Sequence, residues 1–337
     1  MRKPLAACLL TATVLLSACG GSPADDATGG STTPSSTPST TPSTTPSTTP
    51  STTPSTTTGA SPTPDLTHQQ QHGGTTPVTK VLVFVVENHS LDEMRSEMPR
   101  SYALAQKYGY ATNYQAVTHP SLPNYLTIAG GDTRGVTDDD PPSDHPLQGP
   151  SIFARALAAG RTAGLYADAM PSPCDTESAG RYAVKHNPWA YFPGERADCQ
   201  RYDVPAPALD AAVSSGRLPN VGMVVPDLCN DAHDCSLATA DSWIAGKVAT
   251  VMGGPDWASG HLAIVITADE DDGHSVPDTD NRVLTVVIHP SQHHHVVTTA
   301  LTHRSLYGLY EDVLGVPHTE PSTVGSMARA FGLPLRS

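Results

Sequence analysis

The chain has 337 residues, of which 33 are acidic and 19 are lysine or arginine, giving a formal net charge of −14. Proteins that bind nucleic acid use basic surfaces, so this charge argues against nucleic acid as a partner. For the same reason it argues against tight electrostatic docking on anionic lipid.

The first residues have the features of an export signal. Arg2 and Lys3 precede a mostly apolar run from Leu5 to Leu16, which is too short to span a bilayer permanently. The following Leu-Ser-Ala-Cys sequence, ending at Cys19, is typical of a lipobox. We therefore expect residues 1–19 to be a lipoprotein signal peptide, and the exported protein to be anchored to the cell-surface membrane through lipidated Cys19. The alternative is an ordinary secretory signal, which would also export the chain but without the anchor.

A low-complexity segment follows the signal. Residues 31–58 repeat Ser-Thr-Thr-Pro and contain too little apolar surface to offset the chain entropy of folding. We expect residues 20–75 to form a disordered stalk rich in Ser, Thr and Pro, and residues 76–337 to form one catalytic domain. We expect this protein to be a monomer.

Four cysteines lie in the predicted domain, an even number in an oxidising compartment. We expect disulfides Cys174–Cys199 and Cys229–Cys235, because the members of each pair are close in sequence. Three connectivities are possible. Thiolate metal ligation is the less favoured alternative, since no CxxC spacing occurs.

Continuous apolar runs predict strands that are buried on both faces, as in a parallel sheet. Helical patterns lie between them, and this alternation predicts an α/β sandwich with helices on both faces of a mostly parallel sheet. The expected strands are residues 80–86, 161–166, 221–225, 262–267 and 283–288, and the expected helices include 101–108, 151–159 and 236–252.

Acidic residues follow three of these runs directly. Glu87 and Asn88 come after the first, Asp227 after the run at 221–225, and the four acids 269–272 after the run at 262–267. Ligands of open α/β sheets bind outside the carboxyl ends of the strands. We therefore expect these side chains to meet at one edge around a hard divalent cation, although an acidic solvated turn would give the same run of residues.

A second motif surrounds Ser121, in the sequence His-Pro-Ser-Leu-Pro-Asn-Tyr at 119–125. The prolines restrict the backbone beside Ser121, which suits a nucleophile, and Asn124 can present an amide to an oxyanion. No Gly-x-Ser-x-Gly elbow is present, so activation by a carboxylate or a metal fits better than a serine triad. The motif alone is also compatible with a proline-rich loop that contains an incidental serine.

Three further places carry candidate residues. The loop 226–235 contains Asp227 just before Cys229, and Asp231 between Cys229 and Cys235; a disulfide-stapled surface loop explains it equally well. Lys185 and His186 offer two groups suited to a phosphate, and His303 is a candidate final ligand. Either histidine could instead be an ordinary surface residue.

These motifs together resemble a known family. The segments of this chain that carry the resemblance are ENHS at 87–90, THPSLPNY at 118–125, KHNP at 185–188, PDLCNDAHDCS at 226–236, TADEDDG at 267–273 and NRVLTVVI at 281–288. They are similar to the bacterial phosphoesterase family, which contains acid phosphatases and phospholipases C and belongs to the alkaline phosphatase superfamily. The similarity is greatest to secreted acid phosphatases that include phosphatidylinositol 3-phosphate phosphatases.

The resemblance implies an alkaline-phosphatase-like three-layer sandwich and assigns roles to the motifs. It makes Ser121 the nucleophile and Asn124 its oxyanion partner, with Lys185 and His186 contacting the phosphoryl group. Glu270 and Asn88 stand where the superfamily has other ligands, so we expect a divalent ion such as Ca²⁺, Mg²⁺, Mn²⁺ or Zn²⁺, with harder ions favoured. The implied metal ligands are Glu87, Asn88, Asp227, Asp231, Asp269, Glu270 and His303.

The sequence therefore predicts an exported phosphomonoester hydrolase of the acid phosphatase type that forms a phosphoserine. Its substrate would be a phosphorylated small molecule or a phosphoinositide. A phosphodiesterase of the phospholipase C type is the alternative, and a low aromatic content of 5% argues mildly against a choline cage. A non-catalytic surface lipoprotein that binds Ca²⁺ is the second alternative, and the Ser121 motif argues against it.

Overall fold

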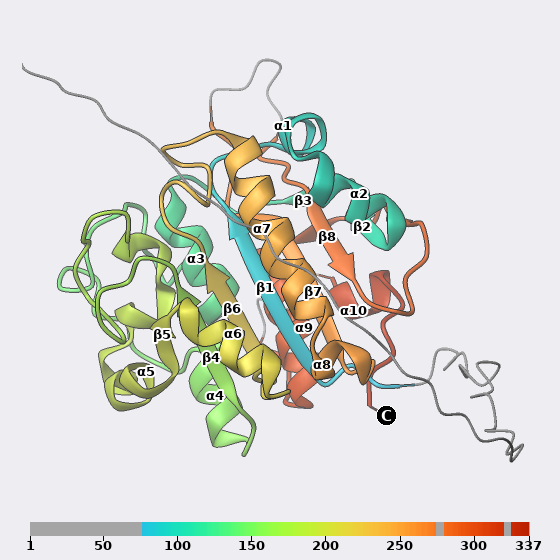
Figure 1. Ribbon diagram of the computed structural model, residues 1–337. Coiled ribbons are helices and arrows are strands. Elements are labelled where there is room, and N and C mark those ends of the chain that lie inside the picture. Colours follow the sequence, from blue (N-terminus) through green and yellow to red (C-terminus); the bar gives the residue numbers. More distant parts are fainter. Residues whose placement is uncertain (1–75, 274–279, 320–324, 337) are drawn as a thin grey trace, which may run out of the picture. The chain divides into compact units, whose positions relative to one another are not determined.

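The computed structural model describes residues 76–273, 280–319 and 325–336 (Figure 1). Its centre is an eight-stranded sheet in the order β5-β4-β6-β1-β7-β8-β2-β9. The strands are β1 (Lys80–Val86), β2 (Gly109–Ala111), β4 (Ala163–Ala167), β5 (Asp203–Pro205), β6 (Val221–Val225), β7 (Leu262–Ala268), β8 (Thr285–Ile288) and β9 (His295–Val297). A small parallel pair joins β3 (Tyr114–Gln115) to β10 (Leu301–Thr302).

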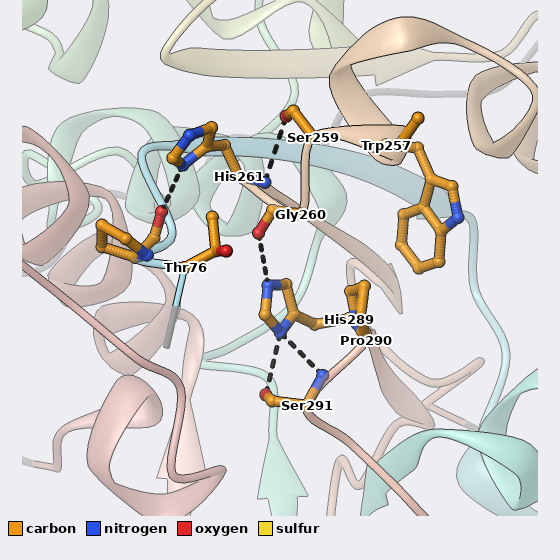
Figure 2. A pocket seen from close by; sticks show the side chains of 10 residues that line it. Thr76, Trp257, Ser259, Gly260, His261, His289, Pro290 and Ser291 are labelled. Atoms are coloured by element: carbon orange, nitrogen blue, oxygen red, sulfur yellow. Dashed lines mark hydrogen bonds between the residues drawn. The ribbon is translucent and has the colours of Figure 1, made fainter. Parts of the chain in front are cut away.

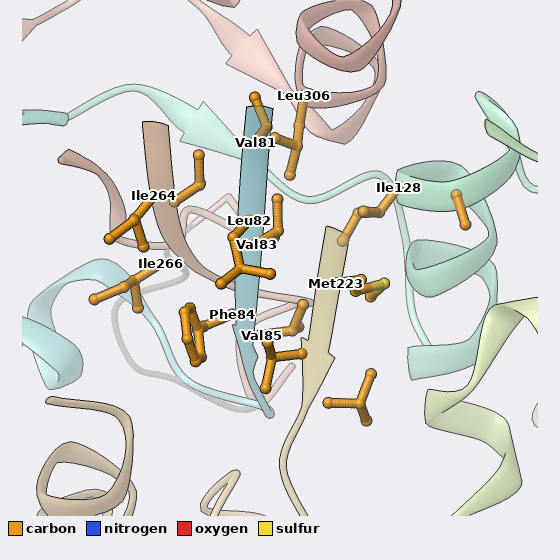
Figure 3. Packing of buried hydrophobic residues seen from close by; sticks show 14 of the residues in the cluster. Val81, Leu82, Val83, Phe84, Val85, Ile128, Met223, Ile264, Ile266 and Leu306 are labelled. Carbon is orange, nitrogen blue, oxygen red and sulfur yellow. The ribbon is translucent and has the colours of Figure 1, made fainter. Parts of the chain in front are cut away.

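Strand β1 occupies the middle of the sheet because both of its faces are apolar. Residues 81–86 are almost completely buried. Figure 3 shows the β1 side chains among those of β6 and β7, together with Ile128 and Leu306 from two helices. Full burial of each aliphatic side chain contributes roughly 1.5–3 kcal/mol, so this strand anchors the core.

Helices cover both faces of the sheet, and in Figure 1 α7 crosses in front of it. One group packs around α7 and the other around α9. The first group contains α1 (Leu91–Glu97), α2 (Pro99–Lys107), α6 (Pro207–Ser214), α7 (Leu237–Met252) and α8 (Pro255–Ala258). The second contains α3 (Ser121–Gly130), α4 (Ile152–Ala158), α9 (His303–Leu314) and α10 (Met327–Ala330). The short helix α5 (Arg196–Tyr202) packs beside β5.

The predicted meeting of strand ends is confirmed. Strand β1 pairs in parallel with β6 on one side and with β7 on the other. Their carboxyl ends, followed by Glu87, Asp227 and Asp269, therefore lie at the same edge of the sheet.

Most predicted elements are present, with one difference in direction. The predicted strands 80–86 and 221–225 have the observed bounds of β1 and β6, whereas β8 is antiparallel to β7 and shorter than predicted. A run buried on both faces indicates a central strand but carries no information on its direction, which explains the difference. The short strands β2, β3, β5, β9 and β10 have no comparable apolar run.

Both predicted disulfides, Cys174–Cys199 and Cys229–Cys235, are present in the structure. The predicted signal peptide at 1–19, with Cys19, and the predicted stalk at 20–75 lie outside the described residues, so both stay predictions. Within the described part of the chain, no helix combines the length and apolarity needed to cross a membrane.

A buried acid connects β5 to the segment that contains Lys185 and His186. Asp203 Oδ2 accepts a hydrogen bond from Asn187 Nδ2 at 2.8 Å, and Oδ1 has no hydrogen-bond partner among the described residues. Burial raises the pKa of Asp203 to about 8, because the amide of Asn187 only partly replaces the lost hydration. Asp203 is therefore mostly protonated at neutral pH.

We expect Asp203→Asn to weaken the pH dependence of stability. The pKa is raised from 3.8 to about 8 on folding, so the folded protein binds this proton more tightly than the unfolded chain. The resulting stabilisation is full at low pH and is lost as the pH rises from about 4 to about 8. The wild type should lose up to about 1.4 kcal/mol per pH unit relative to the variant in that window. Urea unfolding of both proteins at pH 5 and pH 8 measures their free energies of unfolding. If wild type and variant differ by the same free energy at both pH values, the prediction is contradicted.

Candidate active site

Ser121 is the first residue of α3, at the edge of the sheet where β1 and β7 end. It follows Pro120, which is joined to His119 by a cis peptide bond. The Ser121 hydroxyl donates a hydrogen bond to Glu87 Oε1 at 2.7 Å and lies 3.3 Å from Glu270 Oε1. Its side chain is thus held between two carboxyl groups that follow different strands.

A buried positive charge stabilises Glu87. His186 Nε2 lies 2.9 Å from Glu87 Oε1, and its Nδ1 lies 3.2 Å from Asp231 Oδ2. Burial lowers the pKa of His186, but the two carboxylates outweigh this effect and raise it to about 9. Burial likewise raises the pKa of Glu87, but the charges of His186 and Lys185 outweigh it and lower the value to about 2. At neutral pH, therefore, an imidazolium lies between the two acids.

Lys185 supplies a second positive charge. Its Nζ lies 3.4 Å from Ser121 Oγ and 3.8 Å from Glu87 Oε1, and it donates to Asp139 Oδ2 at 3.0 Å. The predicted pair Lys185 and His186 therefore both reach the surroundings of Ser121.

Two further acids lie on the β7 side of Ser121. Burial raises the pKa of Asp269 well above its ordinary value, and the charges of Glu87 and Glu270 add to this effect. Burial, with the charges of Glu87 and Asp139, raises the pKa of Glu270 to about 8. Asp269 Oδ1 accepts a hydrogen bond from the Asn88 backbone amide at 3.0 Å, but Oδ2 is buried without a hydrogen-bond partner in the described structure.

The acids around Ser121 are candidates for holding a divalent cation, although the groups of described His, Cys and acidic residues whose ligand atoms all lie within 4.8 Å of one another do not include them. An unpartnered, buried carboxyl oxygen beside two more acids is costly, and hard cations prefer such oxygen ligands. Among the predicted ligands, the structure brings together Glu87, Asn88, Asp269 and Glu270; the Asn88 amide donates to Glu87 Oε1 at 3.3 Å.

The other three predicted ligands have protein partners. Asp227 Oδ1 accepts from the backbone amides of Cys229 and Asn230, which closes the turn after β6. Asp231 contacts His186, as described above. His303 Nδ1 lies 3.0 Å from the Tyr114 hydroxyl and its Nε2 lies 2.5 Å from the Asp269 carbonyl oxygen. The geometry gives these residues supporting contacts, and their role as metal ligands stays a prediction.

The Asn124 amide is also engaged. It donates to Thr118 O at 2.7 Å and to Glu270 Oε2 at 3.0 Å, while its oxygen accepts from Val117 N at 2.9 Å. Asn124 thus fixes the loop that precedes Ser121 and connects it to Glu270. Its proposed contact with an oxyanion stays a prediction.

Three residues of the site were not among the predicted site residues. Tyr125 donates to Glu87 Oε2 at 3.2 Å and stacks on His186 with ring centroids 4.9 Å apart. His119 Nδ1 lies 3.0 Å from Glu270 Oε2. Asp139 contacts both Lys185 and the backbone of α3. Tyr125 and His119 lie inside the Ser121 motif, so that motif is their only local signal; Asp139 lies outside every motif.

A separate cavity of about 670 Å³ lies at the opposite edge of the sheet, where β1 and β7 begin (Figure 2). It is lined by Trp257, His261 and His289, among others. His289 Nε2 donates a hydrogen bond to Gly260 O at 3.0 Å, so its ring faces the backbone and not a cluster of acids. None of the described residues lining this cavity is a predicted site residue.

The profile of the Phosphoesterase family matches residues 94–317. This chain belongs to the Phosphoesterase family. The matched span contains Ser121, Lys185, His186 and the acids after β6 and β7, whereas Glu87 and Asn88 precede it.

Relatives with assigned names agree with this membership. The phosphatidylinositol-3-phosphatase of Mycobacterium tuberculosis is 30% identical over 247 residues, covering 72% of this chain and 79% of that protein. The phosphate-repressible acid phosphatase of Penicillium chrysogenum is 28% identical over 268 residues, covering 74% of this chain and 56% of that protein. The acid phosphatase of Aspergillus fumigatus is 25% identical over 233 residues, covering 66% and 48%. This chain spans about half the length of these fungal relatives. The predicted enzyme class, a phosphatase of the phosphoesterase type, is confirmed.

Solved structures share the fold at low sequence identity. A protein of the alkaline phosphatase superfamily from Vibrio parahaemolyticus aligns with a TM-score of 0.55 and 10% identity, over 76% of this chain and 71% of that one. The phosphonate monoester hydrolase of Silicibacter pomeroyi aligns with a TM-score of 0.52 and 14% identity, over 76% of each chain. The predicted alkaline-phosphatase-like sandwich is therefore confirmed.

Proposed function

We propose that this chain is an exported phosphomonoester hydrolase of the acid phosphatase type that works through a phosphoserine at Ser121. The observation that carries the proposal is the surroundings of the Ser121 hydroxyl. It donates to an ionised carboxylate at 2.7 Å and has an ammonium group 3.4 Å away. The carboxylate can accept the proton that the serine loses when it acts as a nucleophile. The ammonium group can offset the negative charge of a bound phosphoryl group.

In the first step, Ser121 Oγ attacks phosphorus while its proton passes to Glu87, the ionised acceptor. The bond from phosphorus to the alcohol oxygen breaks, and the departing alkoxide takes a proton from solvent. In the second step, water attacks the phosphoserine, and the bond from Oγ to phosphorus breaks. Ser121 Oγ recovers its proton from Glu87, and phosphate leaves with the oxygen of water. Lys185 and His186 would offset the charge of the phosphoryl group throughout.

We propose that Asp269 and Glu270, on the β7 side of Ser121, hold a divalent cation, with Glu87 and Asn88 next to them. When bound, such an ion stabilises negative charge on the nucleophile and on the phosphoryl oxygens. The unpartnered Asp269 Oδ2 and the raised pKa of Glu270 support this site, because a cation would relieve both.

For the substrate we propose a phosphomonoester, with phosphatidylinositol 3-phosphate as a candidate. The support is the name of the relative from Mycobacterium tuberculosis, of which the alignment spans 79%. We propose export and anchoring through Cys19 on the basis of the signal and lipobox in residues 1–19.

Ser121→Ala is expected to lower turnover of a simple phosphomonoester by at least about 10³-fold, because the nucleophile is lost. Initial rates with p-nitrophenyl phosphate measure the loss, and mass spectrometry of acid-quenched wild type looks for phosphate on Ser121. Ser236→Ala is a matched control, since Ser236 also stands at a helix start but contacts Thr239 and no acid of the site. Unchanged turnover in the Ser121 variant would reject the assignment.

Divalent cations are expected to raise the thermal unfolding temperature of metal-free protein, because an ion that binds only the folded state stabilises it. Calcium, magnesium, manganese and zinc are added singly after chelation, and unfolding and phosphatase rate are both recorded. Asp269→Asn should reduce the temperature shift, whereas Asp210→Asn, at an exposed ion pair with Lys247, should not. If the cation raises the unfolding temperature of both variants equally, the ion binds elsewhere and the proposed site is wrong.

Cys19→Ser is expected to move the full chain from the membrane fraction to the soluble exported fraction of a bacterial host, because the lipidated residue is absent. Immunoblots of the fractions measure the distribution, with Cys8→Ser as the control inside the same signal. Retention of the Cys19 variant in the membrane fraction would contradict the anchor.

A further inference from the structure

Asp139 connects two parts of the site that the sequence places far apart. One carboxylate oxygen, Oδ1, accepts a hydrogen bond from the Leu122 backbone amide at 2.9 Å, in the first turn of α3. The other, Oδ2, accepts from Lys185 Nζ at 3.0 Å. A single side chain therefore contacts both the helix that begins with Ser121 and the ammonium group beside the Ser121 hydroxyl.

The position of Lys185 depends on such a contact. Its flexible stem has many rotamers, and only a fixed partner holds the compact charge in one place. Nζ lies 3.0 Å from Asp139 but 3.8 Å from Glu87, so Asp139 makes the shorter of the two contacts with carboxylates. This holds Nζ at 3.4 Å from Ser121 Oγ, where a bound phosphoryl oxygen would meet it.

The loop that carries Asp139 is tied to the segment that carries Lys185. The Tyr191 hydroxyl donates to Asp140 O at 3.1 Å, and Leu147 N donates to Tyr191 O at 2.9 Å. Tyr191 ends the short helix Pro188–Tyr191, which follows Lys185 almost directly. The two segments are therefore held in register by contacts that do not involve Asp139 itself, so the loop keeps its place when that side chain changes.

We propose that Asp139 is a positioning residue that holds Lys185 against the phosphoryl site of Ser121. The inference rests on the proposed function and deepens it. Phosphate affinity then depends on the Asp139 carboxylate, the Lys185 ammonium group and the first turn of α3 acting together. Asp139 itself touches neither the substrate nor the nucleophile.

A purely structural role for Asp139 predicts a different result. Its side chain is 29% exposed, and ion pairs at partly exposed positions contribute little to stability. Asp139→Asn keeps an oxygen that can accept from Leu122 N but removes the charge that holds Lys185. A positioning role thus predicts weaker phosphate binding with little change in stability, whereas a structural role predicts the reverse.

The experiment uses the full chain with inorganic phosphate as the probe. Asp139→Asn should weaken phosphate binding, measured by calorimetry, and raise KM for p-nitrophenyl phosphate, each about tenfold, the usual scale for a lost charge-assisted contact. Asp140→Asn is the matched control, because Asp140 is next in the loop and is held through its backbone. That variant should bind phosphate like the wild type.

A double-variant cycle tests whether Asp139 acts through Lys185. If it does, Asp139→Asn adds no further loss of phosphate affinity to Lys185→Met. Independent, multiplying losses overturn the inference, as does an Asp139→Asn variant whose affinity and KM equal those of Asp140→Asn. A variant that loses thermal stability but keeps its phosphate affinity also overturns it.

The calorimetric readout does not require turnover. Failure of the proposed function appears as full turnover in Ser121→Ala, while failure of this inference appears as unchanged phosphate affinity in Asp139→Asn. The two outcomes are therefore distinguishable in one set of proteins.

Discussion

The burial of several carboxyl groups at one edge of the sheet is the constraint on which the site depends. Glu87, Asp231 and Asp269 are fully buried, and Glu270 is 3% exposed. Like charges this close, and away from water, repel one another strongly. His186 makes their proximity tolerable, because its imidazolium contacts two of the acids and its ring stacks on Tyr125. The sheet brings the strand ends together, and the charge of His186, with that of Lys185, allows Glu87 to stay ionised beside Ser121.

The surrounding fold keeps the acids in place mainly through the backbone. The Glu87 amide donates to Asp231 O at 2.9 Å, and the Asp269 amide donates to Val86 O at 3.0 Å, so the ends of β1 and β7 and the loop after β6 are joined directly. The Cys229–Cys235 disulfide closes the loop that carries Asp231. Burial lowers the pKa of His303 to about 4, so it stays neutral and holds the Asp269 carbonyl without adding charge. These backbone and histidine contacts therefore support the acids without adding charge to the site.

Local sequence was enough to predict the scaffold and the meeting of the acidic strand ends at one edge of the sheet. The buried runs that form β1, β6 and β7 carry their own signal, and the acids after them follow from the rule that parallel strands end at one edge. Asp139 could not be predicted in this way, because residues 138–140 are three consecutive aspartates and only the tertiary structure selects the middle one. Tyr125 reads as an ordinary buried helix residue, and its contact with Glu87 depends on how α3 packs against β1. The direction of β8 was missed because burial on both faces is the same for either direction.

The carboxyl groups on the two sides of Ser121 differ in whether a positive charge of the protein lies beside them. On the Glu87 side, Lys185 and His186 belong to the protein and keep the carboxylate ionised, so this half is complete on its own. On the β7 side, Asp269 and Glu270 have raised pKa values, and Asp269 Oδ2 has no hydrogen-bond partner in the described part of the chain. Ser121 lies on the boundary, 2.7 Å from one half and 3.3 Å from the other. A doubly charged phosphomonoester can be stabilised by the first half, but the second half would repel it while its acids are ionised. The proposed cation therefore belongs on the Asp269 side, where it turns the repelling half of the site into an attracting one.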